Sequence, residues 1–386
     1  MSGKIAQNPN RQSGAIGSIP SATKSASNPT ITTNPSTGVG TEWINTTSGD
    51  VFLCTDATTD ANWWINQRGD SIKAPGQRGL TAGGYNSNYS PTRTNVIDYI
   101  TIDTPGNGTD FGDLSIGSGG ASGDSNGVSG RAIFYIEYSS ADDYSNAIDY
   151  FTISTPGNST DFGNTTLARY QAGSANNGTS DRSVLAGGRA SGSTNNDTID
   201  YVTISTPGNS TDFGNLSAGG RSYTHAAFSN GTNERGVWSG GEMGGGALDN
   251  VETTEYVTIS TTGNSTNFGN LSTNQKGAGA TSNATNERGI VMGGNNGSYI
   301  NFISYFTINS PGNTTDFGDL TQARGFCSAL SNGTGERGIC CWGIDSSAPY
   351  FDIYDYVTIS STGNATDFGD GTIETQSPGS TSNGFL

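Results

Sequence analysis

The 386-residue sequence has little of the residue types that catalytic and metal sites most often use. It contains a single histidine, His225, with no nucleophile elbow and no metal-ligand spacing around it. A Ser-His-Asp arrangement or a histidine metal site would have to use that one residue. The sequence therefore favours a protein that is not an enzyme and that carries no metal or other cofactor.

Basic residues are also scarce. The chain has 17 Lys and Arg against 34 Asp and Glu, a formal net charge of −17. Binding to nucleic acid or to an anionic membrane requires a basic face. The first residues lead into polar sequence without an apolar core, so neither a signal peptide nor a transmembrane helix is expected. We expect no nucleic-acid partner and no membrane insertion.

Cysteine is limited to Cys54, Cys327, Cys340 and Cys341, which is no disulfide framework. A hairpin centred between residues 333 and 334 would place Cys327 opposite Cys340. The sequence leaves open whether these two are bonded or are small buried residues.

What the sequence does have is a repeat. The stretch Ile199 to Ser217 recurs six times, lightly edited, and its tyrosines are 51, 51, 55, 49 and 51 residues apart, at Tyr99, Tyr150, Tyr201, Tyr256, Tyr305 and Tyr356. A fixed period near fifty residues indicates a repeat architecture. The periodicity overrules the disorder that 58 glycines and a hydrophobic fraction of 31% would suggest.

Each repeat predicts four strands. A Tyr-x-Thr-Ile strand, a Pro-Gly-Asn-Ser-Thr turn and an Asp-Phe-Gly-x-Leu strand form one hairpin. A second hairpin precedes it, with Ala278 to Asn283 and Arg288 to Gly294 as its strands in the fifth copy. This pattern resembles the kelch repeat, in which one strand ends in Asn-Gly, the next ends in Gly-Gly, and a spaced Tyr and a later aromatic follow.

The kelch resemblance implies an all-β fold with one propeller blade per repeat. Residues 380–384 match residues 329–333, while no such strand precedes Arg78. We therefore expect a six-bladed ring in which the C-terminal strand completes the first blade. The resemblance weakens in the second copy, which has Ile136 and Glu137 in place of Gly-Gly, and in the sixth, which has Trp342.

Charged residues recur with the repeat. Six arginines open the Gly-Gly strands, and we expect them to brace turns, with a ring of anion-binding arginines as the weaker alternative: Arg78, Arg131, Arg182, Arg235, Arg288 and Arg337. Four further basic residues recur where the small-residue strand begins: Arg169, Arg221, Lys276 and Arg324. Aspartates recur at the Pro-Gly-Asn turn, where turn capping is favoured over calcium binding: Asp110, Asp161, Asp212, Asp316 and Asp367.

The chain before the repeats has two parts. Residues 1–39 lack the apolar content for a core and are expected to form an extended attachment arm with Ile16 and Ile19 as docking residues. Residues 40–76 predict a small β-hairpin module and a linker. The module contains Trp43, Trp63 and Trp64 and is too small to be stable alone, so we expect it to pack on another surface or on another copy of the chain.

This module, with its Gly-Thr-x-Trp-x-Asn-Thr-Thr and Val-Phe-x-Cys-Thr-Asp-Ala-Thr segments, resembles a short element of bacteriophage tail-fibre and other virion structural proteins. The resemblance covers about 30 residues. It implies localisation in the virion, with residues 1–76 bound to other virion or tail proteins.

Within residues 77–386 the loops between the second and third strands vary most between copies: 85–94, 138–146, 189–197, 242–250, 295–300 and 344–352. Tyrosines among small polar residues are typical of recognition surfaces. The predicted ligand-binding residues are Tyr85, Tyr89, Tyr138, Tyr144, Arg189, Met243, Tyr299, Tyr350 and Phe351.

We therefore expect a tail fibre or appendage whose propeller binds a glycan or protein of the host surface. The alternatives are a virion connector or decoration protein that packs on other virion proteins, and a polysaccharide depolymerase. The depolymerase would use loop carboxylates such as Asp142, Asp143 and Glu242.

Overall fold

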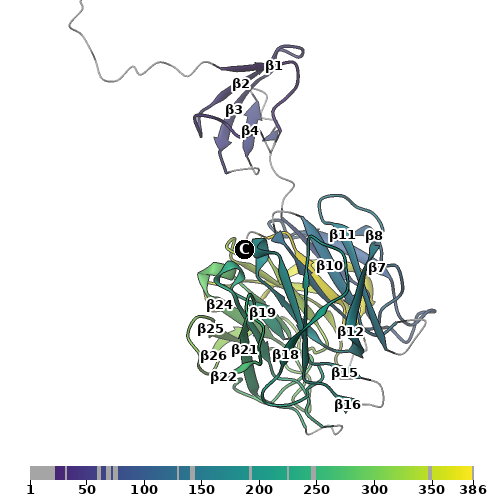
Figure 1. Ribbon diagram of the computed structural model, residues 1–386. Coiled ribbons are helices and arrows are strands. Elements are labelled where there is room, and N and C mark those ends of the chain that lie inside the picture. The colour runs from purple at the N-terminus through teal and green to yellow at the C-terminus, as the bar shows by residue number, and fades with distance from the viewer. Residues whose placement is uncertain are drawn as a thin grey trace, which may run out of the picture. The chain divides into compact units, whose positions relative to one another are not determined.

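The computed structural model describes residues 22–30, 33–58, 62–66, 71–72, 77–127, 130–139, 144–190, 194–223, 226–244, 249–346 and 350–384. The chain divides into two compact units, Met1–Gly76 and Gln77–Leu386 (Figure 1). Both are built from β-strands. The described helices are the short 3-10 turns Gly178–Ser180, Gly231–Asn233 and Ala284–Asn286, and none could span a bilayer.

Unit 1 is one five-stranded sheet in the order β1-β2-β3-β4-β5. Its strands are β1 (Thr23–Ser25), β2 (Glu42–Asn45), β3 (Val51–Asp56), β4 (Trp63–Asn66) and β5 (Ser71–Ile72). The core consists of Phe52, Cys54 and Trp64, with the Trp43 ring edge-on to Trp64 at 6.1 Å. β1 pairs in parallel with β2, so part of the segment predicted as an extended arm belongs to the sheet.

Unit 2 contains six antiparallel sheets, which we number in chain order. Five have four strands and the second has six. Sheet 1 comprises β31 (Gly379–Ser382), β6 (Arg78–Ala82), β7 (Val96–Thr101) and β8 (Thr109–Asp113). Sheet 2 comprises β9 (Ala121–Ser125), β10 (Arg131–Ile136), β11 (Ser145–Thr152), β12 (Thr160–Tyr170), β15 (Arg189–Ala190) and β16 (Thr194–Asn195). Sheet 3 comprises β13 (Gly173–Asn176), β14 (Arg182–Ala186), β17 (Thr198–Thr203) and β18 (Thr211–Asn215).

The remaining sheets repeat the four-strand pattern. Sheet 4 comprises β19 (Ala227–Ser229), β20 (Arg235–Ser239), β21 (Thr253–Thr258) and β22 (Thr266–Asn270). Sheet 5 comprises β23 (Gly279–Ser282), β24 (Arg288–Met292), β25 (Phe302–Thr307) and β26 (Thr315–Asp319). Sheet 6 comprises β27 (Ser328–Ser331), β28 (Arg337–Gly343), β29 (Phe351–Thr358) and β30 (Thr366–Thr375).

Sheet 1 is assembled from two distant parts of the chain. β31 pairs with β6 in the register Gly379↔Ala82 to Ser382↔Gly79. The Asn383 side-chain oxygen also accepts a hydrogen bond from the Arg78 backbone amide, with a distance of 2.6 Å between nitrogen and oxygen. This pairing agrees with the expectation that residues 380–384 supply the missing strand of the first repeat.

Successive sheets pack face to face through apolar clusters. Each of six clusters draws its buried residues from two neighbouring sheets, and the cluster of Ile100, Leu330, Ile339 and Trp342 joins sheet 6 back to sheet 1. The first strands contact one another in the order β9, β13, β19, β23, β27, β31 and β9 again. Burial between sheets is therefore how a chain with few large apolar residues makes a core.

The recurring arginines also join neighbouring sheets, and they do not simply brace turns as predicted. Each guanidinium lies 4.4–4.8 Å from the ring of its own sheet's recurring tyrosine. The same group donates to a backbone carbonyl of the next sheet, as Arg235 does to Ile308 at 2.6 Å and Arg337 to Ile102 at 2.9 Å. Each of these arginines thus combines a cation–π contact within its own sheet with a hydrogen bond to the next sheet.

The Asp-Phe-Gly glycine has a similar role at the outer strands. A Cβ at Gly214 would lie 2.4 Å from the Gly263 carbonyl oxygen, and its φ of +152° disfavours other residues. Beside it, the Asn264 side chain accepts a hydrogen bond from the Asn215 amide at 3.0 Å. The glycine therefore allows the turn of the next repeat, here Thr262-Gly263-Asn264, to dock on the preceding sheet.

Candidate functional site

The ends of the sheets that carry the varied loops, which we call the loop end, enclose a cavity of about 520 Å³. We call it the loop-end cavity. It is lined by five aromatic residues and a single charged residue, Arg93: Tyr85, Thr92, Arg93, Gly119, Tyr138, Tyr170, Gln171, Tyr223, Phe326, Ile344, Gln376 and Ser377. A concave, largely aromatic surface with a few polar groups is typical of small-ligand sites.

Several lining residues adopt a backbone conformation that their side chains disfavour. Just before the first strand of a sheet, Gln171, Tyr223, Phe326 and Ser377 have φ values between +53° and +62°. Sheet 5 has Gly277 at the equivalent position, with φ of +63°. Glycine adopts this conformation freely, whereas a bulky residue pays about 1–2 kcal/mol. Large side chains at this strained position are therefore unnecessary for the fold and point to function.

Arg93 lies against the aromatic wall. Its guanidinium carbon is 3.8 Å from the centre of the Tyr138 ring. A Cβ at Gly119 would lie 3.1 Å from both Arg93 Cγ and Tyr138 Cδ1, so the glycine makes room for this pair. The guanidinium is thereby stacked at the edge of the cavity.

Further aromatic rings support the wall from behind. Tyr170 contacts Tyr138 and Tyr144 at centroid distances of 5.2 and 5.4 Å. Phe326 contacts Tyr223 at 5.5 Å and Tyr299 at 6.3 Å. These contacts hold the rings of the cavity in fixed positions, which reduces the entropy lost when a ligand binds.

The predicted ligand-binding residues divide into three groups. Tyr85 and Tyr138 line the cavity. Tyr144 and Tyr299 pack behind it, Tyr350 contacts Tyr85 at 6.4 Å, and Arg189 on β15 pairs with Tyr170. Tyr89 and Met243 are 38% and 42% exposed and do not line it. Phe351, predicted as a loop residue, is instead the first residue of β29 and is buried, because the strand begins two residues earlier than the repeat suggests.

Sequence reasoning missed Arg93, Tyr170, Gln171, Tyr223 and Phe326. Four of them lie in the segments that lead into the first strands, whereas all the predicted ligand-binding residues come from the loops between second and third strands. The signal was present, because these positions hold Tyr or Phe in some repeats and Gly in another.

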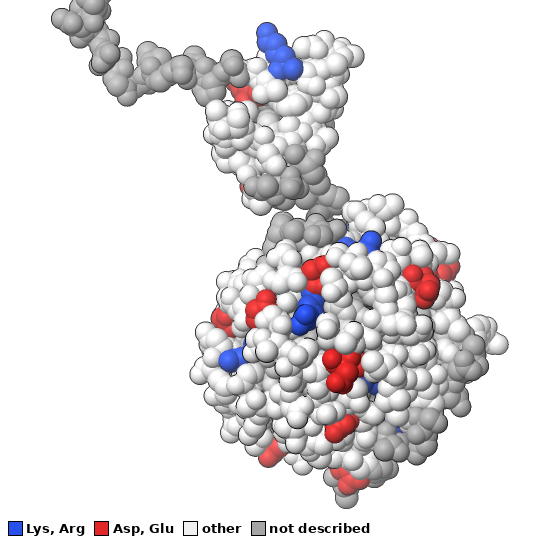
Figure 2. Space-filling model, viewed as in Figure 1, with Lys and Arg blue, Asp and Glu red and all other residues white. Residues whose placement is uncertain are grey.

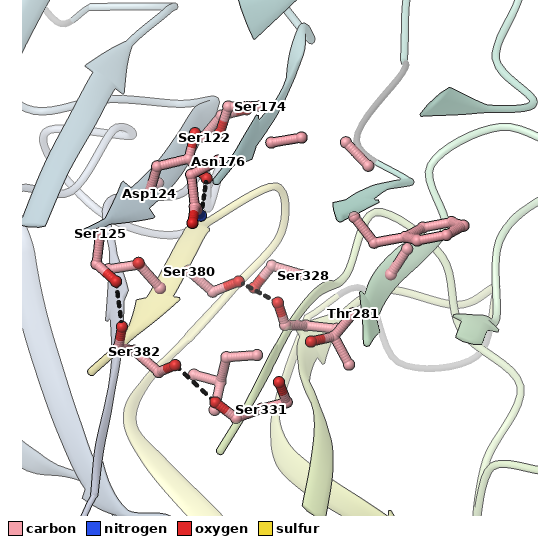
Figure 3. A pocket seen from close by; sticks show the side chains of 18 of the residues that line it. Ser122, Asp124, Ser125, Ser174, Asn176, Thr281, Ser328, Ser331, Ser380 and Ser382 are labelled. Carbon is pink, nitrogen blue, oxygen red and sulfur yellow. Dashed lines mark hydrogen bonds between the residues drawn. The ribbon is translucent and has the colours of Figure 1, made fainter. Parts of the chain in front are cut away.

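A second, smaller cavity of about 110 Å³ lies between the first strands of all six sheets (Figure 3). Small and hydroxyl side chains line it, with Asp124 as its one acidic residue. Asp124 accepts hydrogen bonds from Ser183 and from Asn176 at 2.9 Å, and the Tyr135 and Ser183 hydroxyls are 2.7 Å apart. Burial raises the pKa of Asp124 to about 6 despite these bonds.

Glu137, the residue that replaces glycine in the second repeat, is buried next to the loop end. It accepts hydrogen bonds from the Ser122 hydroxyl and the Ala172 amide, both at 3.1 Å. Burial raises the pKa of its carboxyl to about 8, so it is mostly protonated at pH 7.

Three further expectations concern charged residues. Asp142, Asp143 and His225 lie outside the described residues. Glu242 forms an ion pair with Lys276, with side-chain exposures of 4% and 16%. The prediction that Lys276 is the counterpart of Arg169, Arg221 and Arg324 is wrong, because the preceding residue, Gln275, occupies the equivalent backbone position. The Gln275 carbonyl accepts a hydrogen bond from the Gly241 amide, just as the Arg221 carbonyl accepts one from the Gly188 amide. Elsewhere in the described chain, no three His, Cys, Asp or Glu side chains cluster as a metal site would require.

The cysteine and attachment predictions have mixed outcomes. All four cysteines are free and buried, and Cys340 pairs with Ala329, two residues from the expected Cys327. The hairpin is centred between residues 334 and 335, one residue later than predicted, which shifts the register by two residues. Trp43 and Trp64 pack in unit 1, Trp63 lies on β4, and Ile16 and Ile19 fall outside the described residues.

No family model matches this chain, and neither does any curated protein.

Proposed function

We propose that this protein is a bacteriophage tail-fibre or appendage protein whose unit 2 is a six-bladed β-propeller that binds a host-surface glycan in the loop-end cavity. The observation that carries the binding function is the strained backbone at Tyr223 and Phe326, where a glycine would serve the fold better. A cost in stability that the fold does not require is typical of binding sites.

The propeller is supported by the contacts between sheets. The first strands contact one another in a cycle that returns to β9, and β31 and β6 pair residues about 300 positions apart. The arginine bridges follow the same order and also return from sheet 6 to sheet 1. Closure of such a ring leaves no exposed sheet edge at the join.

A glycan fits the chemistry of the loop-end cavity. Sugar rings have apolar C–H faces that pack on aromatic rings, and their hydroxyls need amide and hydroxyl partners. The aromatic lining offers the first kind of contact, and the Gln376 amide with the Thr92 and Ser377 hydroxyls offers the second. The concave shape favours a small group such as a saccharide over the flat epitope of a folded protein.

The place in a virion rests on unit 1, whose Trp43 to Thr55 segment resembles elements of virion structural proteins. Its sheet exposes Leu53 and Ile65, which pair in register and are 42% and 39% exposed. Apolar side chains on the outer face of a small sheet suit contact with another virion protein.

The test uses the purified full chain as a competitor of virion adsorption to the host. We expect the chain to block adsorption in a dose-dependent way and the variant Tyr223→Gly to lose at least tenfold in potency. Its unfolding free energy should remain within about 1 kcal/mol of the original, because relief of backbone strain offsets the lost packing. Tyr89→Ala, a loop tyrosine outside the cavity, is the matched control and should compete normally.

Two results would overturn the proposal. If the folded full chain does not block adsorption at concentrations well above that of the virion, the connector or decoration role replaces receptor binding. If Tyr223→Gly competes as well as the unaltered chain, the loop-end cavity is not the binding site.

A further inference from the structure

Glu137 is an acidic residue in an unusual place. On the face drawn in Figure 2, acidic side chains are scattered over the surface of unit 2, in contact with water. Glu137, by contrast, is only 2% exposed. The other five repeats have a glycine at the equivalent position: Gly84, Gly188, Gly241, Gly294 and Gly343. The repeat therefore folds without a carboxyl group here, and the presence of one asks for another reason.

The Glu137 carboxyl contacts a strained segment of the loop-end cavity. Gln171 lines this cavity with a φ of +62°, and Ala172 follows it in the chain. The Ala172 amide donates a hydrogen bond to Glu137 Oε2 at 3.1 Å. In another sheet the strained residue is held by backbone alone, since the Phe326 amide donates to the Gly277 carbonyl at 2.6 Å. A strained backbone persists only where its surroundings fix it, and next to Gln171 a side chain contributes to this.

The Ser122 hydroxyl takes part in the same contact. Its oxygen lies 3.1 Å from Glu137 Oε1 and 2.8 Å from the Ala172 carbonyl oxygen, and it has one proton for these two oxygens. When Glu137 is protonated, its carboxyl can donate to Ser122 while the hydroxyl donates to Ala172, so both bonds form together. When Glu137 is ionised, the hydroxyl donates to the carboxylate, and the Ala172 carbonyl loses its bond.

The surroundings of Glu137 favour its protonated form. Burial raises the pKa of its carboxyl to about 8, despite its hydrogen bonds and the charge of Arg169. Arg169 on β12 is itself ion-paired with Asp200 on β17 at 2.8 Å. Tyr135 on β10 interacts with Arg169 and stays neutral, because burial raises its pKa well above its usual value. The described neighbours from β9 and from the entry to β13 do not titrate: Ser122, Gln171 and Ala172.

Building on the proposed function, we infer that Glu137 is a positioning residue of the loop-end cavity. In its protonated form it holds the segment of Gln171 and Ala172 in place, and its ionisation displaces that segment and weakens ligand binding. A buried carboxylate needs water, and water reaches it when the segment moves away. Because Gln171 belongs to the lining, the cavity loses part of its wall in that movement. Affinity is therefore full near neutral pH and falls as the pH rises through 8.

The first experiment follows the segment itself and needs no ligand. Pulsed amide hydrogen exchange of a peptide covering residues 167–175 is compared between the unaltered full chain and Glu137→Gln, at pH 7 and at pH 9. The glutamine cannot ionise, and it keeps an acceptor for Ala172 and a donor for Ser122. We expect equal exchange at pH 7. At pH 9 exchange should be about fivefold or more faster in the unaltered chain, because its segment opens.

Ser122→Ala tests the same contact from its other side. The change removes the hydroxyl that bonds the Ala172 carbonyl, so we expect the segment to exchange faster than in the unaltered chain already at pH 7. Unchanged exchange at pH 7 would show that this contact does not hold the segment. Thermal unfolding at both pH values checks that every chain is folded.

The second experiment measures binding of the labelled full chain to isolated envelopes of host cells at pH 7 and pH 9. With a pKa of about 8, about one folded molecule in ten is protonated at pH 9, so affinity should fall about tenfold. Glu137→Gln should bind equally at both values. Glu252→Gln makes the same change at an exposed position and should keep the full pH dependence. Asp124, with a pKa of about 6, is ionised at both values and does not contribute.

The outcomes separate the inference from the function on which it rests. Faster exchange and weaker binding at pH 9, both absent in Glu137→Gln, support both. Equal exchange of the two chains at pH 9 overturns the inference, whatever the envelopes bind. Faster exchange with equal affinity at both pH values overturns the coupling and leaves receptor binding standing. Absence of binding to the envelopes at pH 7 overturns the proposed function and the coupling with it, even where the difference in exchange is found.

Discussion

The two ends of the sheets in unit 2 use the same residue types for different purposes. At the end that carries the regular turns, which we call the turn end, every arginine stacks on a tyrosine and bonds the next sheet, as Arg235 does with Tyr256 and Ile308. At the loop end, Arg93 also stacks on a tyrosine, Tyr138, but this pair lies at the cavity and does not recur at the same positions of the other described repeats. The first arrangement joins neighbouring sheets, whereas the second lies at the loop-end cavity.

This difference shows how a repeat protein can separate stability from function. Contacts that recur six times stabilise the fold together, so one end of each sheet can vary without loss of the architecture. The following changes test that separation, in order of decreasing effect.

The largest effect is expected from Gly214→Ala at the docking point of the outer strand. The new Cβ would lie 2.4 Å from the Gly263 carbonyl oxygen, and φ is +152°. We expect the free energy of unfolding to fall by about 2–4 kcal/mol, measured by chemical denaturation. Gly208→Ala, at a turn glycine with no heavy atom within 4 Å of the added Cβ, is the control. Equal losses in both variants would contradict the docking role.

The next effect concerns pH and the buried acid Glu137. Its pKa is about 8 in the folded protein and is ordinarily 4.5, so the folded state binds more protons between these values. Stability from this group is therefore greatest below about pH 4.5 and is lost as pH rises towards 8, by an amount of the order of a few kcal/mol. Glu137→Gln should reduce this decline when unfolding free energy is compared at pH 5 and pH 8. If unfolding free energy falls as much between pH 5 and pH 8 in Glu137→Gln as in the unaltered chain, Glu137 is not a protonated acid in the folded protein.

A smaller loss is expected from Arg235→Gln at the turn end. The change removes the contact with Tyr256 and the 2.6 Å bond to Ile308. These interactions contribute about 1–2 kcal/mol to stability and nothing to ligand binding. Tyr223→Gly should show the reverse pattern, with competition for virion adsorption reduced and unfolding nearly unchanged. If both variants affect stability equally, the proposed separation between the two ends fails.

The smallest effect is expected from Tyr89→Ala. Its side chain is 38% exposed and does not line the loop-end cavity, although it lies in a varied loop. We expect a change in unfolding free energy within about 0.5 kcal/mol and unchanged binding. A loss of binding would extend the recognition surface beyond the cavity.

Much of the local structure could be predicted from the sequence. The period, the strand patterns and the match of residues 380–384 to 329–333 led to four strands per repeat and to the pairing of β31 with β6. Contacts between sheets could not be read in the same way, because they join residues of different repeats, such as Asn215 and Asn264, which are 49 positions apart. Asn264 was therefore interpreted as a turn former, although its side chain binds the amide of Asn215.

The candidate site was predicted only in part for a related reason. Tyr85 and Tyr138 were found because their loops differ between repeats. Tyr223 and Phe326 were missed because variation between repeats was compared only in the loops between second and third strands, and Arg93 because its partner Tyr138 lies in another sheet. Which residues of the loop end contact one another depends on how neighbouring sheets pack, and residue type alone does not reveal this.

The pairing of β31 with β6 has a consequence for how the protein is made. During translation β6 emerges about 300 residues before β31, a delay of roughly 15–60 s at 5–20 residues per second. Through that interval sheet 1 lacks its first strand, and the amide and carbonyl groups along one side of β6 have no strand partner. We expect nascent chains halted before residue 379 to depend on chaperones and to aggregate when released, whereas chains released after Ser382 should not.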